Sequence, residues 1–237
     1  MSAFRPRYRG LLLALGIFVF GVVATAALHA ISADLVWTRL FYGPGGPNDG
    51  WVYGRQSPWS YLYDYGEFPA LVLLVFAVAL YAAAWIGKAS AHHKRACLVI
   101  ILTVILGPGL LVNGILKPHW GRPRPAEIEA FGGSQKYHEV WEIGVPGQGK
   151  SFPCGHCSAA FATASLVSFF PSHPVLSVAA LLGGIVYGGL MGIARIAQGA
   201  HFPTDVLWSG IIVLMLIVLL CYVAFPVRSR DRSDQRE

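Results

Sequence analysis

Charged side chains are scarce in this chain of 237 residues. Asp, Glu, Lys and Arg make up 13% of it, whereas soluble domains contain about 25%. Hydrophobic residues make up 55%. The sequence also lacks low-complexity stretches and internal repeats, and it contains only four cysteines. This balance excludes an ordinary soluble domain and indicates a membrane protein.

Five uncharged runs are long enough to cross a hydrocarbon core, which takes about 20 helical residues. They cover residues 11–33, 69–87, 97–116, 174–194 and 206–225. A shorter run, 157–170, predicts a sixth helix that starts near Gly155. Because the first run is longer than a signal-peptide core of roughly 7–15 residues, we expect it to be retained. The sequence predicts an all-α polytopic membrane bundle of six transmembrane helices, with no separate soluble domain within residues 1–237.

Basic residues flank these runs unevenly. They gather before the first run (Arg5, Arg7, Arg9), between the second and third (Lys88, Lys94, Arg95) and after the last (Arg228, Arg230, Arg232, Arg236). With six crossings these clusters fall on one side, which the positive-inside rule makes the cytoplasm. Both termini are then cytoplasmic, and connections 34–68, 117–154 and 198–204 face outward. The net charge of +6 reports topology, and nucleic acid is not expected as a partner.

The stretch "KPHWGRPRP" follows the third run at residues 117–125. Its two Arg-Pro steps disfavour helix at Arg122 and Arg124, so we expect the helix to end near Lys117 and an extended basic strap to follow. A basic flank that reaches toward the membrane surface is one interpretation. Three cations so close together repel one another, however, unless they share an anion.

The stretch "SFPCGHCSAAF" (151–161) places Pro153 and Gly155 just before a helical run, with His156 in its first turn. The free N–H groups of a helix N-terminus form an anion site. The C-x-x-C spacing of Cys154 and Cys157 suggests a thioredoxin-like dithiol, but that motif needs a βαβ pattern, which these helical surroundings do not supply. A disulfide between the two stays open on an oxidising side of the membrane.

The stretch "GIARIAQGAHFPTDVLWSG" (192–210) places Arg195 at the end of the fifth run, His201 in a turn and Asp205 at the start of the last run. His201 and Asp205 share one helical face if the turn is already helical at His201. A carboxylate so placed fixes the imidazole tautomer and stabilises its charged form.

These three stretches lie at the outer ends of different helices, so the fold can bring them to one site. Cationic side chains, a helix N-terminus and two histidines together make a pocket for a doubly charged oxyanion that also holds a nucleophile and an acid. This combination predicts phosphoryl transfer in which fixed positive charge takes the part that magnesium often fills. No metal and no cofactor are expected.

The same residues resemble the type-2 phosphatidic acid phosphatase superfamily, the membrane lipid phosphatases related to acid phosphatases and vanadium haloperoxidases. Its motifs are K-x6-R-P, P-S-G-H and S-R-x5-H-x3-D, and the last two each differ here by one residue. The agreeing positions are Lys117, Arg124 and Pro125, then Pro153, Gly155 and His156, then Arg195, His201 and Asp205. Order and spacing agree across residues 117–205, the motif-bearing core.

The resemblance implies a role for each site residue. His201 attacks phosphorus to form a phosphohistidine, Asp205 holds and polarises it, and His156 protonates the leaving oxygen. Phosphate oxygens would be held by Lys117, Arg124, Arg195, Cys154 and Gly155. Two departures each remove a hydroxyl, since Cys154 and Ala194 replace the family's serines. Arg122 is an extra cation and a candidate for binding a second phosphate.

An outward site at head-group level predicts a membrane-lipid substrate, in a bacterial inner membrane with the site facing the periplasm. A lumenal site in the endoplasmic reticulum is the alternative. A lipid A phosphate or undecaprenyl diphosphate is preferred over phosphatidylglycerol phosphate or phosphatidic acid. The aromatic loop 34–68 suits the membrane interface and could cover the site. Carboxylates in loop 126–150, including Glu127, Glu139 and Glu142, could screen it or contact a head group.

Three other functions stay open. A phosphotransferase would use the same first step and pass the phosphate to a second lipid. A non-catalytic anion or lipid carrier would use the same cationic pocket without chemistry. A membrane disulfide oxidoreductase would instead depend on Cys154 and Cys157.

Overall fold

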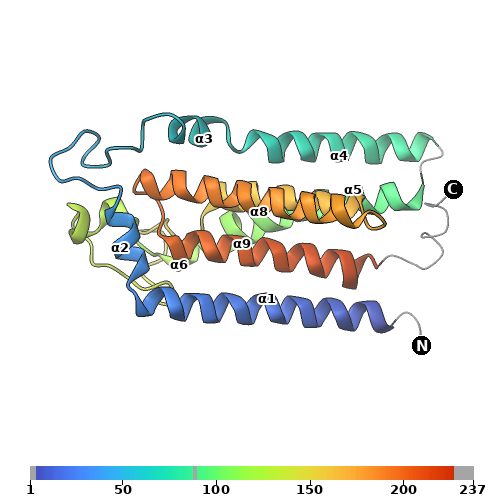
Figure 1. The fold of residues 1–237 in the computed structure, drawn as a ribbon, viewed down its shortest axis with the longest axis horizontal. Helices are drawn as coiled ribbons and strands as arrows, with labels where there is room; N and C mark the ends of the chain where they lie inside the picture. The colour runs from blue at the N-terminus through green and yellow to red at the C-terminus, as the bar shows by residue number, and fades with distance from the viewer. Residues whose placement is uncertain (1–3, 88–89, 227–237) are drawn as a thin grey trace.

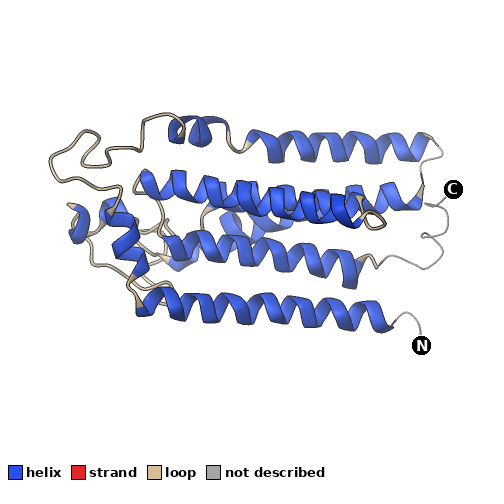
Figure 2. Cartoon of the chain, viewed as in Figure 1, coloured by secondary structure: helices blue, strands red, loops and turns tan. Residues whose placement is uncertain are grey.

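A computed structural model describes residues 4–87 and 90–226. Every regular element in these two ranges is a helix, and the long helices lie lengthwise beside one another (Figures 1 and 2). Short helices and loops gather at one end of the bundle. The predicted all-α membrane bundle is confirmed.

Five helical segments within the described ranges are long and apolar enough to cross a membrane. They are built from α1 (Phe4–Ala30), α4 (Phe68–Ile86), α5 (Ala91–Val104) with η1 (Ile105–Leu116) and α6 (Lys117–Trp120), α8 (Pro174–Ala197), and α9 (Pro203–Val218) with η5 (Leu219–Ala224). Each segment contains most of one of the five predicted apolar runs. The chain is therefore an integral membrane protein with several apolar helices.

The sixth predicted span is shorter than the other five. It begins at Gly155, as expected, but consists of the eight-residue α7 (Gly155–Ala162) and the seven-residue 3₁₀-helix η4 (Thr163–Phe169). With rises of about 1.5 Å per residue in an α-helix and about 2.0 Å in a 3₁₀-helix, their combined length is about 26 Å. The hydrocarbon core of a membrane is about 30 Å thick. About five spans are thus supported, and a sixth crossing remains a prediction.

α7 lies in the centre of the bundle because its residues are small. Cys157, Ala160 and Ala162 are fully buried and form one cluster with Phe161 and residues of α8 and α9. Small residues let membrane helices approach closely. Gly155 allows a close approach here, because a Cβ atom would lie 2.6 Å from Oδ1 of Asn113 in η1 and would displace that side chain. The N-terminus of α7 is thereby held against the helix that carries the first motif.

Large apolar side chains cover the outer surface of the bundle. Leu12 and Phe20 on α1, Val72 and Phe76 on α4, and Val186 on α8 are all more than 40% exposed. Extended apolar surfaces of this kind mark contact with a membrane or another protein. They fit the membrane location of these helices.

The helix that carries the first motif continues beyond Lys117, where it was expected to end. It extends through Trp120, and Gly121 ends it with a positive φ of 68°. The left-handed conformation costs glycine nothing. The predicted extended strap therefore starts at Arg122.

The structure describes only some of the basic residues on which the predicted orientation rests. Arg7 and Arg9 lie in the first turns of α1, and Lys94 and Arg95 in the first turns of α5, at the same end of the bundle (Figure 1). The side chain of Arg5 and residues Lys88, Arg228, Arg230, Arg232 and Arg236 lie outside what the structure describes. Which side of the membrane each end faces remains a prediction.

The opposite end of the bundle has its own small core. Loop 34–68 contains two helices, α2 (Ala33–Arg39) and α3 (Trp59–Tyr65), and the strap continues into η2 (Pro125–Glu127) and η3 (Glu129–Phe131). Trp51, Ile128, Phe131 and Phe202 are buried together between these segments. The two long connections therefore pack against each other and against the start of α9, where the third motif lies.

Candidate active site

His201 lies in the turn between α8 and α9, almost fully buried. Its Nδ1 is 2.5 Å from the carbonyl oxygen of Ser151. A carbonyl can only accept a hydrogen bond, so Nδ1 carries the proton and the lone pair is left on Nε2. Burial lowers the pKa of His201 to about 4, although the contact with Asp205 opposes this shift. His201 is therefore neutral near pH 7, as a nucleophile must be.

Asp205 is fully buried in the first turn of α9. Its Oδ2 accepts hydrogen bonds from Ser151 Oγ at 2.6 Å and Phe202 N at 2.7 Å, and lies 3.8 Å from His201 Nδ1. That distance suits an ion pair but is too long for a hydrogen bond. The condition for a shared helical face is not met, because α9 begins at Pro203, after His201. Ser151 instead links the two residues, with its carbonyl on His201 and its hydroxyl on Asp205.

Arg122 does not offer its charge to a second phosphate. Its side chain is fully buried, with Nη1 2.6 Å from Asp205 Oδ1 and Nη2 2.7 Å from Asp34 Oδ2. It also donates to Thr204 Oγ1 and to the carbonyl of His138, and it lies over the Phe202 ring. The candidate role is corrected: Arg122 neutralises two buried carboxylates and holds Asp205 in place.

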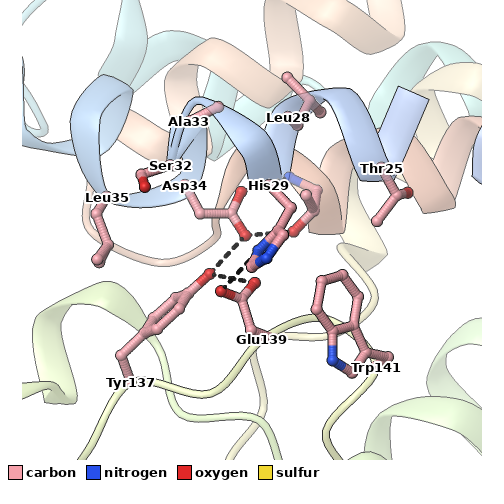
Figure 3. Close-up of a pocket in the computed structure, with 11 residues that line it drawn as sticks. Thr25, Leu28, His29, Ser32, Ala33, Asp34, Leu35, Tyr137, Glu139 and Trp141 are labelled. Carbon is pink, nitrogen blue, oxygen red and sulfur yellow. Dashed lines mark hydrogen bonds and ion pairs between the residues drawn. The ribbon is translucent and has the colours of Figure 1, made fainter. Parts of the chain in front are cut away.

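The network continues from Asp34 to the surface, beside a small cavity of about 30 Å³ (Figure 3). Tyr137 donates to Asp34 at 3.2 Å and lies 3.0 Å from Glu139, which pairs with His29 at 3.0 Å. Glu139 is thus engaged within the loop. Likewise Glu127 accepts from the Arg124 amide and Glu142 from the Glu139 amide. Each of these carboxylates therefore has a partner among the described residues.

His156 is the second residue of α7 and is partly exposed, with its Nδ1 3.5 Å from Glu67 Oε1. Its ring stacks on Tyr63, with centroids 5.3 Å apart and an interplanar angle of 24°. Arg195 lies over the same tyrosine, 4.6 Å from the centroid. Tyr63 and Glu67 belong to loop 34–68, so this loop does contribute to the site.

The three predicted phosphate-binding cations converge on the two histidines. Arg195, Lys117, Arg124 and His201 all act electrostatically on His156, and Arg124 and Arg195 act on Lys117. Within the described residues, the buried Nε atoms of Arg124 and Arg195 have no hydrogen-bond partner. Buried polar groups are rarely left unsatisfied, so this arrangement points to an anion that accepts from them.

The N-terminus of α7 departs in part from its expected role. The Cys154 amide donates to Ser209 Oγ at 2.8 Å and is already engaged. Cys154 and Cys157 form a disulfide, and both are fully buried. Cys154 therefore anchors the helix start to α9 and does not contact phosphate through this amide. Gly155 remains a predicted phosphate contact.

Removing this disulfide is expected to leave the chemistry intact. In the double variant Cys154→Ser and Cys157→Ser, the amide of residue 154 can still bind Ser209, and burial already denies the disulfide to a redox partner. Phosphate release should stay at the wild-type level, with Cys97→Ser as a control for loss of a single buried thiol. Loss of phosphate release in a stably folded double variant would contradict this expectation. A membrane disulfide oxidoreductase would instead show a thiol–disulfide exchange activity that the double variant abolishes.

Sequence reasoning missed four residues of the site: Asp34, Tyr63, Glu67 and Ser151. Ser151 lies within a stretch that was singled out, but its most important group is a backbone carbonyl, which no side-chain pattern reports. Asp34 offered one usable signal, because a carboxylate next to an apolar run needs a partner. Tyr63 and Glu67 carried none, because their loop is rich in similar aromatic and polar residues.

The structure is a membrane helical bundle in which three cationic side chains lie around two histidines, and comparison with known proteins identifies its family. The family model of the PAP2 superfamily matches residues 94–229. The chain therefore belongs to the PAP2 superfamily, and the resemblance drawn from its three motifs is confirmed. A solved structure described as the first transmembrane PAP2-type phosphatidylglycerolphosphate phosphatase, from Bacillus subtilis, matches 94% of this chain and 97% of its own. Its TM-score is 0.50 and its identity 22%, which supports the fold.

Three curated relatives are each named lipid A 4'-phosphatase. The protein from Francisella tularensis subsp. novicida is 33% identical over 62% of this chain and 66% of its own length. Those from Rhizobium leguminosarum and Rhizobium etli are 34% and 32% identical over 61% of this chain, and over 62% and 56% of their own lengths. The matched region thus spans less than two thirds of each relative.

Proposed function

We propose that this protein hydrolyses a phosphate ester of a membrane lipid through a phosphohistidine on His201. One observation carries the proposal: two buried guanidinium N–H groups, on Arg124 and Arg195, have no partner among the described residues and lie with Lys117 around two histidines. A phosphate held by these three cations would satisfy them. It would also meet a neutral nucleophile and an acid.

The reaction needs two steps. In the first, the Nε2 lone pair of His201 attacks phosphorus, the bond from phosphorus to the ester oxygen breaks, and His156 gives that oxygen its proton. In the second, water attacks the phosphohistidine while His156 accepts a proton from it, which releases inorganic phosphate and restores both histidines. Lys117, Arg124 and Arg195 stabilise the charge on the phosphoryl oxygens in both steps.

The preferred substrate is a lipid A phosphate, a monoester on a glucosamine sugar. The names of the three curated relatives support this choice. The burial of Arg122 supports it as well, because the extra cation that could have met the second phosphate of undecaprenyl diphosphate is engaged by Asp34 and Asp205. We place the reaction at the periplasmic face of a bacterial inner membrane, where such a lipid is exposed.

The test is phosphate release by the purified protein in detergent containing EDTA. The panel is lipid A, undecaprenyl diphosphate, phosphatidylglycerol phosphate and phosphatidic acid. We expect release to survive EDTA and to be fastest with lipid A, and mass spectrometry of the product should show loss of one phosphate. Activity that EDTA abolishes would contradict the metal-free route. If phosphate is released fastest from another lipid of the panel, that lipid would replace lipid A as the proposed substrate. If no lipid of the panel releases phosphate, the result would contradict the proposed activity.

A further inference from the structure

Two residues outside the three family motifs contact motif residues at the site. Tyr63 lies in α3 and Glu67 directly precedes α4. Glu67 Oε1 is 3.5 Å from His156 Nδ1, and the Tyr63 ring is stacked on the imidazole. The same ring lies under the Arg195 guanidinium. The imidazole thus has a carboxylate at one nitrogen and an aromatic ring on one face.

Two side chains, one in α8 and one directly after it, hold the backbone on either side of α3. Tyr187 donates from its hydroxyl to the carbonyl of Gly66 at 2.8 Å, and Gln198 donates to the carbonyl of Gly54 at 3.1 Å. Gly66 is buried so tightly that a Cβ atom would lie 2.1 Å from the Met191 side chain. Glu67 follows Gly66 directly, so its backbone is held by the same helix that carries Arg195.

The charges around His156 oppose its protonation. It faces Arg195 from α8, Lys117 from α6, Arg124 from the strap and His201 from the turn before α9, with Tyr63 and Glu67 on the remaining side. Burial first, and then the positive charges of Arg195, Lys117 and Arg124, lower the pKa of His156 to about 4. An acid needs a proton at working pH, so it requires nearby negative charge. A bound phosphate supplies part of it, and Glu67 is placed to supply more.

We propose that Glu67 is a positioning residue for the general acid His156, an inference that rests on the proposed function. By pairing with the protonated Nδ1 at 3.5 Å, the Glu67 carboxylate stabilises the imidazolium form and leaves the opposite nitrogen, Nε2, directed away from Glu67. As the bond from phosphorus to the ester oxygen breaks, the Nε2 proton passes to that oxygen. The imidazole becomes neutral and keeps its remaining proton on Nδ1, which still faces the Glu67 carboxylate. Tyr63 holds the ring plane during this transfer.

The test compares leaving groups with Glu67→Gln. An alkyl or sugar phosphate needs its leaving oxygen protonated, whereas p-nitrophenolate leaves without a proton. We expect kcat for the lipid phosphate to fall about 10-fold, less than the 10²–10⁴-fold contribution of a general acid. We expect kcat for p-nitrophenyl phosphate to stay unchanged. Removing the negative charge disfavours the imidazolium, so the alkaline limb of kcat should move to lower pH by about one unit.

Matched variants separate this role from others. Asp64→Asn removes the same charge from an exposed position three residues away. It should leave kcat unchanged for both the lipid phosphate and p-nitrophenyl phosphate. Glu67→Asp should restore part of the lipid rate. In a His156→Ala background, Glu67→Gln should cause no further loss, because the residue it positions is absent.

The outcomes distinguish this inference from the function on which it rests. If the wild type is active, two results would overturn the role of Glu67 alone. One is an equal loss of kcat on both substrates in Glu67→Gln, and the other is an alkaline limb of kcat that stays at the wild-type pH. A wild-type protein that releases phosphate from neither ester would overturn the proposed function as well. A loss confined to the lipid phosphate, together with the pH shift, would support the inference.

Discussion

Replacing His201 with asparagine is expected to lower kcat by about 10⁴–10⁶-fold, the range found when a catalytic nucleophile is removed. That loss corresponds to about 5–8 kcal/mol of transition-state stabilisation. The asparagine amide can still donate to the Ser151 carbonyl, so the turn before α9 keeps its hydrogen bond, but it has no lone pair that can attack phosphorus. Folding should persist while the chemistry stops. The measurement is phosphate release together with thermal unfolding in detergent.

Trapping the intermediate makes this result specific. Brief exposure of the wild type to a substrate labelled on phosphorus should leave label on the protein in an acid-labile, base-stable form, as expected of a phosphorus–nitrogen bond. His201→Asn should leave none. His119→Ala is a matched control, since it removes an exposed histidine near the first motif. Turnover that persists in His201→Asn would place the nucleophile elsewhere. If neither the wild type nor His201→Asn shows turnover, and both bind and move lipid equally well, the result would favour a non-catalytic lipid carrier.

The elements that sequence predicts best here are those under the strongest physical constraint. An apolar run of about 20 residues has few alternatives to a membrane helix, and five such runs appear as helices. The start of α7 at Gly155 was also predictable, because small residues and a preceding proline are typical of a helix start. The length of α7 could not be predicted in the same way. The chain changes to 3₁₀ geometry over Thr163–Phe169, and this change depends on packing against neighbouring helices.

The site was predictable where side chains carry charge and less so where the backbone acts. Lys117, Arg124, Arg195, His156 and His201 were recognised because cations and histidines at helix ends are unusual in a membrane protein. The link from His201 to Asp205 through Ser151 depends on a carbonyl oxygen. Arg122 was misjudged for a different reason: its carboxylate partner Asp34 lies 88 positions away in sequence, and spacing within a motif reveals nothing about such a contact.

Arg122→Met is expected to destabilise the fold by about 3–5 kcal/mol, the cost of leaving buried charges without their partner. The substitution keeps most of the side-chain volume but removes the guanidinium that lies within 2.7 Å of both Asp34 and Asp205. Two carboxylates, 5% and 0% exposed, would then lie near each other without a counter-charge. The apparent melting temperature in detergent should fall by about 10 °C, and activity should fall with it because Asp205 loses its anchor.

Arg124→Met provides the matched comparison, because Arg124 lies two residues further along the same strap and loses the same charge. Its buried Nε has no described partner, so its removal should leave the melting temperature nearly unchanged while it weakens phosphate binding and turnover. A combined Arg122→Met and Asp34→Asn variant should recover part of the stability lost in Arg122→Met, since one buried charge is removed. Similar melting temperatures for Arg122→Met and the wild type would contradict the structural role, and equal stability losses at both arginines would contradict the division between them. We therefore expect Arg122→Met to lower mainly stability and Arg124→Met to lower mainly phosphate binding and turnover. This difference would separate the roles of the two arginines: Arg122 stabilises the carboxylate of Asp205, and Arg124 binds the substrate.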